Sequence, residues 1–150
     1  NGIVSMPLTC SFSAYPNSTQ TNITVGSQQD LEFDAEMWDL NADFNTTTYT
    51  FTAPITGKYL FTMSFGLSGY DTACTEYAAR LATSNRTYEF RNEDGRMYAQ
   101  DGFKTWTGSI VAEMDAADTA LCRILQSTGT AQTDLIGGST RSWFTGRLLD

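Results

Sequence analysis

The stretch FTAPITGKYLFTMSFGL, residues 51–67, has the pattern that decides the fold prediction. After Gly57, apolar side chains occupy every second position, namely Tyr59, Phe61, Met63, Phe65 and Leu67. A period of two is typical of a β-strand that turns one face toward a core. Pro54 cannot donate a ladder hydrogen bond and is expected at a strand end, while Gly57 can supply a positive φ for a turn. The stretch therefore predicts the end of one strand, a turn and a second, long strand.

Shorter alternating runs lie on both sides of this stretch. They predict strands at residues 10–15, 23–25, 30–33, 48–54, 97–116, 120–126 and 142–149. The run at 97–116 fits one long strand or two shorter ones. Turn-forming residues predict loops at 34–48, 84–96 and 127–140, with a helical turn as an alternative at the start of 34–48. Many short strands joined by turns predict an all-β sandwich or barrel.

Residues 71–83 are the one segment whose type the local pattern leaves open. A helix fits this segment, and so does a strand that turns five side chains inward, namely Ala73, Thr75, Tyr77, Ala79 and Leu81. Local propensity does not separate the two, so the segment fits either a helix or a strand.

The composition is that of one acidic domain. The chain has 150 residues, 41% of them hydrophobic, which is enough for one core. Its formal net charge of -8 repels phosphate backbones and anionic lipid. No apolar run is long enough to span a bilayer. We therefore expect no nucleic-acid partner and no membrane insertion.

The three cysteines, Cys10, Cys74 and Cys122, are widely spaced, and the chain has no CxxC motif. A zinc site built on them is therefore not expected. Three buried thiols are the simplest interpretation, and one disulfide with one free thiol is the alternative.

A longer spacing pattern spans the first half of the chain. Phe33, Asp39, Phe44, Phe51 and Gly57 are separated by five, four, six and five residues, and Tyr59 and Phe61 follow on alternate positions. This pattern resembles the signature of the C1q globular domain, a member of the C1q/TNF superfamily. Seven of its eight positions match, and Met63 stands where the family usually has an aromatic residue. FSAY near the start and WFTGRLL near the end are similar to the family's first and last strands.

The resemblance implies a domain organisation, a fold and an assembly. Residues 1–9 are expected to be a lead-in segment, and residues 10–150 a C1q-like domain. The implied fold is an all-β jelly-roll sandwich of about ten antiparallel strands, and the implied assembly is a homotrimer. The residues expected in the core or at trimer contacts are Phe33, Phe51, Gly57, Tyr59, Phe61 and Phe144.

A second, narrower resemblance concerns short segments. NGIVSMPL, TSNRTY, EMDAADTA and FTGRLL are similar to C1q-type modules of phage virion proteins, especially tail fibres. This resemblance implies a virion location and other virion proteins as partners. The implied function is that of a fibre or tail-tip adhesin that binds a host-surface glycan or protein. A secreted C1q/TNF-type recognition protein and a purely architectural, capsid-decorating protein are the alternatives.

The sequence favours a binding protein over an enzyme. It contains no histidine, so the usual general base and the commonest zinc ligand are missing. Glu113 and Asp115 could form a carboxylate pair of the kind that glycosidases use, but a solvated acidic face is the simpler interpretation. No cofactor is expected, apart from Ca²⁺ as a candidate. The carboxylates considered for it lie in predicted turns, namely Asp71, Asp94, Asp115 and Asp118.

Aromatic residues in or beside predicted loops are the candidate receptor contacts, because exposed rings can form platforms for ligands. They are Tyr70, Tyr88, Phe90 and Trp106, and for Tyr88 and Phe90 core packing or trimer contact is the favoured alternative. The loops expected to touch a receptor are residues 69–72, 86–96 and 128–134.

Overall fold

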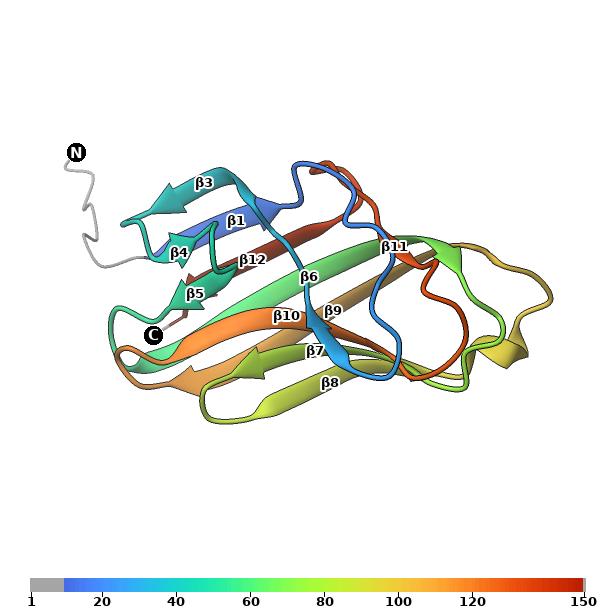
Figure 1. Cartoon of the computed structure of the whole chain (residues 1–150). Helices are drawn as coiled ribbons and strands as arrows, with labels where there is room; N and C mark the ends of the chain where they lie inside the picture. The colour runs from blue at the N-terminus through green and yellow to red at the C-terminus, as the bar shows by residue number, and fades with distance from the viewer. Residues whose placement is uncertain (1–9, 150) are drawn as a thin grey trace.

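A computed structural model describes residues 10–149 as a sandwich of two six-stranded antiparallel sheets (Figure 1). The lead-in expected at residues 1–9 lies outside the described part. No α-helix occurs within residues 10–149, where one short 3₁₀ helix, η1, spans Gly95–Met97. The strands are β1 (Ser11–Tyr15), β2 (Gln28–Asp30), β3 (Ala35–Leu40), β4 (Phe44–Asn45), β5 (Thr50–Thr52), β6 (Gly57–Tyr70), β7 (Tyr77–Thr83), β8 (Thr87–Glu93), β9 (Gly102–Met114), β10 (Thr119–Gln126), β11 (Asp134–Leu135) and β12 (Trp143–Leu148).

The two sheets differ in what lies at their centres and edges. In sheet A, β6 lies between β9 on one side and β12 with β11 on the other, and β1 and then β3 follow β12. In sheet B, β10 lies between β7 and the short strands β5 and β2; β8 follows β7, and β4 follows β5. Strands β8 and β9 are thus neighbouring edges of the two sheets. The jelly-roll sandwich predicted from the sequence is confirmed, with twelve strands, two of them only two residues long.

The stretch that decided the fold prediction contains the end of β5, the connection after it and, from Gly57 on, most of β6, which is central in sheet A. All five of its alternating apolar side chains, from Tyr59 to Leu67, are buried. Pro54 lies in the connection between β5 and β6, as expected. The positive φ expected at Gly57 is wrong, because Gly57 is already extended and pairs with Met114 of β9.

Aromatic rings from both sheets meet between them. The ring of Phe12 stacks on Phe44 and Phe51, with centroid distances of 4.8 and 5.0 Å, and meets Phe144 edge-on at 4.9 Å. Phe33, Phe51, Tyr59, Phe61 and Phe144 are all in this core. Burial of each large apolar side chain contributes roughly 1.5–3 kcal/mol, so this cluster accounts for much of the fold's stability.

Residues 34–48, expected to be a loop with a helical turn as an alternative, instead contain β3 and β4. The backbone of β3 pairs with β1, and this tertiary pairing outweighs the turn propensity of the segment. The Asp39 carboxylate accepts bonds from the Asp43 and Phe44 N–H groups, at 3.2 and 2.9 Å, and closes the turn between the two strands.

Several other segments also differ from their predictions. Residues 23–25 form no strand beyond an isolated bridge at Val25, and residues 30–33 are strand only at Asp30, the last residue of β2. In residues 71–83 the helix is wrong, and the strand begins only at Tyr77, so Ala73 and Thr75 lie exposed in a turn. Residues 84–96, expected to be a loop, contain strand β8. The 127–140 loop includes the short strand β11. Strands β8 and β11 lie at sheet edges, and polar edge strands lack the apolar alternation on which the predictions relied. Strand β7 is instead decided by its pairing with β10 and β8 on both sides.

The three cysteines are buried and free, so the alternative with a disulfide is wrong. Burial raises the pKa of the Cys10 and Cys122 thiols. A raised pKa keeps a thiol protonated and unreactive at neutral pH, which fits a packing role for both side chains.

Gly146 of β12 faces the aromatic core where there is no room for a methyl group. A Cβ at this position would lie 2.5 Å from Phe12 Cε1 and 2.8 Å from the Phe61 ring. Because overpacking a tight core costs about 1–3 kcal/mol, we expect Gly146→Ala to lower the free energy of unfolding by that amount. Urea denaturation followed by tryptophan fluorescence measures the change.

Gly102→Ala is the matched control, because a Cβ there would meet nothing within 4 Å. Equal stabilities of the two variants would show that β12 does not pack against the aromatic cluster as described.

Candidate functional site

Three loops meet at the end of the sandwich opposite both ends of the described chain (Figure 1). They connect β6 to β7, β8 to β9 and β10 to β11, and their residues are 71–76, 94–101 and 127–133. We call this surface the loop surface. Of the three loops expected to contact a receptor, 128–134 lies almost wholly within it. The loop 69–72 contributes only its second half, since Gly69 and Tyr70 belong to β6. The third, 86–96, is mostly strand β8, and only its end reaches the loop surface.

Asp71 connects two of these loops from beneath. Its buried carboxylate accepts bonds from the N–H groups of Ala73, at 2.7 Å, and Thr130, at 2.5 Å. Gly129 makes the close approach feasible, since its φ is +93° and a Cβ there would overlap the Asp71 carboxylate. A buried carboxylate that bonds two backbone groups fixes the relative position of their loops.

Asp101 connects the third loop to the other two. Its carboxylate accepts bonds from the Thr72 N–H, at 2.8 Å, and from Gln132 Nε2, at 3.0 Å. These bonds lower the pKa of Asp101. The loop surface is therefore held by contacts between its own segments, which fix its loops relative to one another.

Two of the four predicted receptor contacts, Tyr70 and Trp106, are buried on strands and do not lie exposed beside loops. Both donate to Glu93 of β8, from Tyr70 Oη at 3.0 Å and Trp106 Nε1 at 3.1 Å. Tyr98 Oη and the Arg91 guanidinium donate to the same carboxylate. Burial would raise the pKa of Glu93, but the hydrogen bonds from Arg91, Tyr70 and Tyr98 outweigh it and lower the pKa. Tyr70 and Trp106 therefore support the loop surface from inside.

The other two candidates, Tyr88 and Phe90, lie on β8 and are partly buried against the core. The Phe90 ring meets Phe65 edge-on, with centroids 5.2 Å apart, and lies directly over Gly108. The Arg86 guanidinium lies 5.9 Å from the centroid of the Tyr88 ring. Core packing thus accounts for Phe90, while Tyr88 keeps a partly open ring.

Two exposed apolar side chains, one within the loop surface and one directly beside it, were not predicted from the sequence. Met97 in η1 is 83% exposed, and Phe103 at the start of β9 is 73% exposed. Phe103 has the same parity along β9 as the exposed residues Thr105 and Val111, and this alternation was the available signal. Exposed apolar groups on a fixed surface are typical anchors for a partner.

The four carboxylates considered for Ca²⁺ do not come together. Asp71 and Asp94 belong to the loop-surface end, whereas Asp115 and Asp118 lie in the turn between β9 and β10 at the opposite end. Asp118 already accepts bonds from Ser84 and Asn85. Within residues 10–149, no group of three or more His, Cys, Asp or Glu side chains could hold a metal ion.

The outer surface of sheet A, which we call face A, carries several exposed apolar side chains. Cross-strand pairing places one row of side chains across it in the order Leu40, Ser11, Arg147, Leu60 and Val111. Leu40 is 54% exposed, and its neighbour Trp38 is 47% exposed. A hollow of about 260 Å³ lies beside Trp38 and Leu60.

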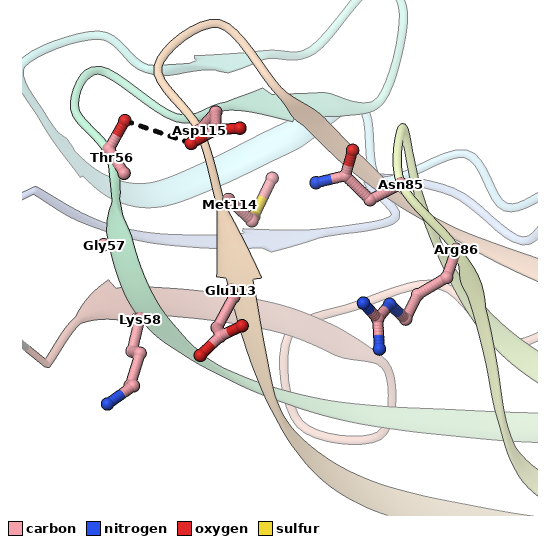
Figure 2. A pocket seen from close by; sticks show the side chains of 8 residues that line it. All are labelled: Thr56, Gly57, Lys58, Asn85, Arg86, Glu113, Met114 and Asp115. Carbon is pink, nitrogen blue, oxygen red and sulfur yellow. Dashed lines mark hydrogen bonds between the residues drawn. The ribbon is translucent and has the colours of Figure 1, made fainter.

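A polar groove lies between the β7–β8 turn and the ends of β6 and β9, away from the loop surface. Figure 2 shows Asn85 and Arg86 on one side of the groove, with Glu113 on β9 facing them and Lys58 on β6 beyond it. Asp115 at the rim accepts a weak bond of 3.4 Å from Thr56 Oγ1. We call this the edge groove.

These surfaces and the fold together define a jelly-roll binding module. The C1q domain family model matches residues 11–149, which is nearly the whole chain. The chain therefore belongs to the C1q domain family. Membership in this family indicates a non-enzymatic recognition module.

Solved structures agree on the fold. The globular domain of zebrafish complement 1qA is 18% identical, with 94% of this chain and 98% of that chain covered and a TM-score of 0.63. Murine APRIL is 8% identical, with 94% and 99% covered and a TM-score of 0.64. The TNF protein Eiger from S. frugiperda is 11% identical, with 95% and 92% covered and a TM-score of 0.59.

Among curated proteins, none was found to match this sequence. Within the described residues, no helix has the length and apolar character needed to cross a membrane.

Proposed function

We propose that this domain forms a homotrimer that binds a host-surface receptor through the loop surface, as the tip of a phage fibre or tail. The observation that carries the proposal is the position of the preorganised loop surface, at the end of the sandwich opposite residues 10 and 149, where the described chain begins and ends. A domain attached to a particle at its terminal end would present these loops outward. Met97 and Phe103 would then be the apolar anchors of the contact.

The virion setting is supported by the phage-type segments. EMDAADTA spans the end of β9 and its turn into β10, and FTGRLL forms most of β12. The two segments are far apart in the sequence, so the similarity is not confined to one turn. A secreted recognition protein is the alternative location, and the sequence that precedes the domain in its full polypeptide would distinguish the two.

Trimer formation is supported by the apolar groups on face A. Trp38 and Leu40 lie on the edge strand β3, and both side chains are exposed. Trp38 also lines the hollow of face A together with Leu60. An exposed apolar edge strand favours association with another chain. A closed threefold ring would cover this patch on every copy and leave no open interface.

The assembly is tested by placing a charge in this patch. We expect Trp38→Glu and Leu40→Glu each to convert the trimer to monomers, because an unpaired carboxylate would be buried at the contact. Sedimentation velocity measures the mass relative to the 16.5 kDa chain. Met97→Glu is the matched control and should stay trimeric, since it places the same charge on the loop surface. A native chain that sediments only as a monomer at micromolar concentration would contradict the proposal.

The receptor function is tested by competition. Purified trimer in excess should block adsorption of the parent particle to host cells, and trimeric Met97→Glu should block it less, because an apolar anchor is replaced by a charge. If the native trimer neither binds cells nor blocks adsorption, the architectural, capsid-decorating role takes the place of the adhesin.

A further inference from the structure

We propose that the edge groove binds a neutral, hydroxyl-rich sugar residue of a glycan. The groove is separate from the loop surface and lies at the other end of the sandwich. The inference therefore stands whether or not the loop surface contacts a receptor.

The shape of the groove suits a small ligand. Two hollows of about 460 and 290 Å³ adjoin each other and share Lys58, Arg86 and Glu113 as lining residues. Small-molecule sites typically enclose about 300–1,000 Å³. One hollow accommodates a sugar ring, and the second offers room for the next unit of a glycan.

The polar groups of the groove have unused hydrogen-bonding capacity. The side chains of Lys58, Arg86 and Glu113 make no hydrogen bond or ion pair within residues 10–149. Asn85 donates its Nδ2 to Asp118, which leaves its Oδ1 as an acceptor. The groove thus presents both donors and acceptors from two facing elements, and a ligand with several hydroxyl groups can satisfy both kinds.

The charge balance favours a neutral ligand over an ionic one. The cations Lys58 and Arg86 are matched by the anions Glu113 and Asp115, so the lining has no net charge. An anionic sugar would meet the two carboxylates, and a cationic ligand would meet the ammonium and the guanidinium. A sugar hydroxyl donates to a carboxylate and accepts from a cation, so it pairs with both without carrying charge.

The groove also has an apolar wall. Val111, which is 51% exposed, and the partly buried Tyr88 line the second hollow. The C–H face of a pyranose ring is apolar and can pack on such side chains while its hydroxyl groups reach the polar wall. This combination of one apolar and one polar wall matches the two-sided chemistry of a sugar ring.

A second copy of this chain is the competing occupant, and the charges argue against it. The apolar patch available for association is formed by Trp38, Leu40 and Leu60. Packing this patch over Lys58, Arg86 and Glu113 would remove charged groups from water without supplying partners, which is costly.

The test is saturation-transfer NMR and calorimetric titration of the native trimer with the methyl glycosides of glucose, galactose, mannose and N-acetylglucosamine. We expect saturable binding of at least one of them. Arg86→Gln and Glu113→Gln should each weaken it at least about tenfold, because each removes a charge-assisted hydrogen bond. Arg141→Gln and Glu32→Gln are the matched controls, since both residues are exposed outside the groove, and they should bind as the native chain does.

Three results would overturn the proposal. The first is the absence of saturable binding for all four glycosides, and the second is binding that persists undiminished in both groove variants. The third is a shift from trimer to monomer in the groove variants, which would assign the groove to the contact between copies. N-acetylneuraminic acid serves as the anionic probe, and binding of this sugar alone would contradict the inference from charge balance. Loss of sugar binding with intact competition for host cells would separate this site from the receptor function.

Discussion

Phe61→Ala should lower the free energy of unfolding by about 3–5 kcal/mol, because it leaves a cavity in the centre of the aromatic core. The Phe61 ring is fully buried and lies 5.6 Å from Phe51 and 5.7 Å from Phe144, measured between centroids. These partners come from sheet B and from β12, so the cavity would loosen the contact between the sheets. Reversible urea denaturation followed by circular dichroism measures the loss.

Phe103→Ala removes the same ring from an exposed position and serves as the control. Because surface substitutions usually change stability by less than about 0.5 kcal/mol, this variant should unfold close to the native chain. A loss below about 1 kcal/mol for Phe61→Ala would show that β6 does not supply the core, and would undermine the spacing signature read from the sequence.

Asp71→Ala should lower the free energy of unfolding by about 2–4 kcal/mol, through the loss of two hydrogen bonds to a buried charged acceptor. The N–H groups of Ala73 and Thr130 would lose their partner beneath the loop surface. Relative to the native chain, the variant should also show faster hydrogen exchange in residues 71–76 and 127–133. The increase should be larger there than in β6. Denaturant titration and exchange mass spectrometry measure the two effects.

Asp94→Ala is the comparison, since Asp94 is more exposed and bonds mainly Arg96 within its own loop. It should leave exchange in the other two loops unchanged. Equal effects of the two substitutions would mean that Asp71 does not join the loops.

Whether a strand could be predicted from the sequence depends on how that strand is buried. Strands β10 and β12 have one face in the core, so their buried residues alternate, and in β6 the large apolar side chains alternate in the same way. The period of two therefore identifies all three strands. Strand β8 lies at an edge and carries mostly polar side chains, and β3 exposes apolar ones. Their type is decided by pairing with β7 and β1, which local sequence does not encode.

The candidate site was less predictable, and Tyr70 shows why. Strict alternation from Leu67 places residue 70 on the outer face of the sheet. The ladder between β6 and β9 shifts register between Leu67 and Tyr70, and Gly69 within that bulge has a φ of +61°. The bulge rotates Tyr70 into the interior. Trp106 could have been placed from sequence, because it shares the parity of the buried residues Ala112 and Met114.

The adjacency of β1 and β12 determines how the domain responds to a pulling force. These strands are antiparallel, and the Leu148 N–H bonds the Cys10 carbonyl at 3.3 Å, so the described chain begins and ends at the same end of sheet A. Tension between the two ends would open this pair one bond at a time, as a zipper opens. Tension between the chain ends and the loop surface would instead run along β6 and β9 and load their many ladder bonds together, in shear. If the domain is attached at its ends and bound at its loops, force therefore acts in the shear direction. This direction resists force better than the sequential opening of the β1–β12 pair.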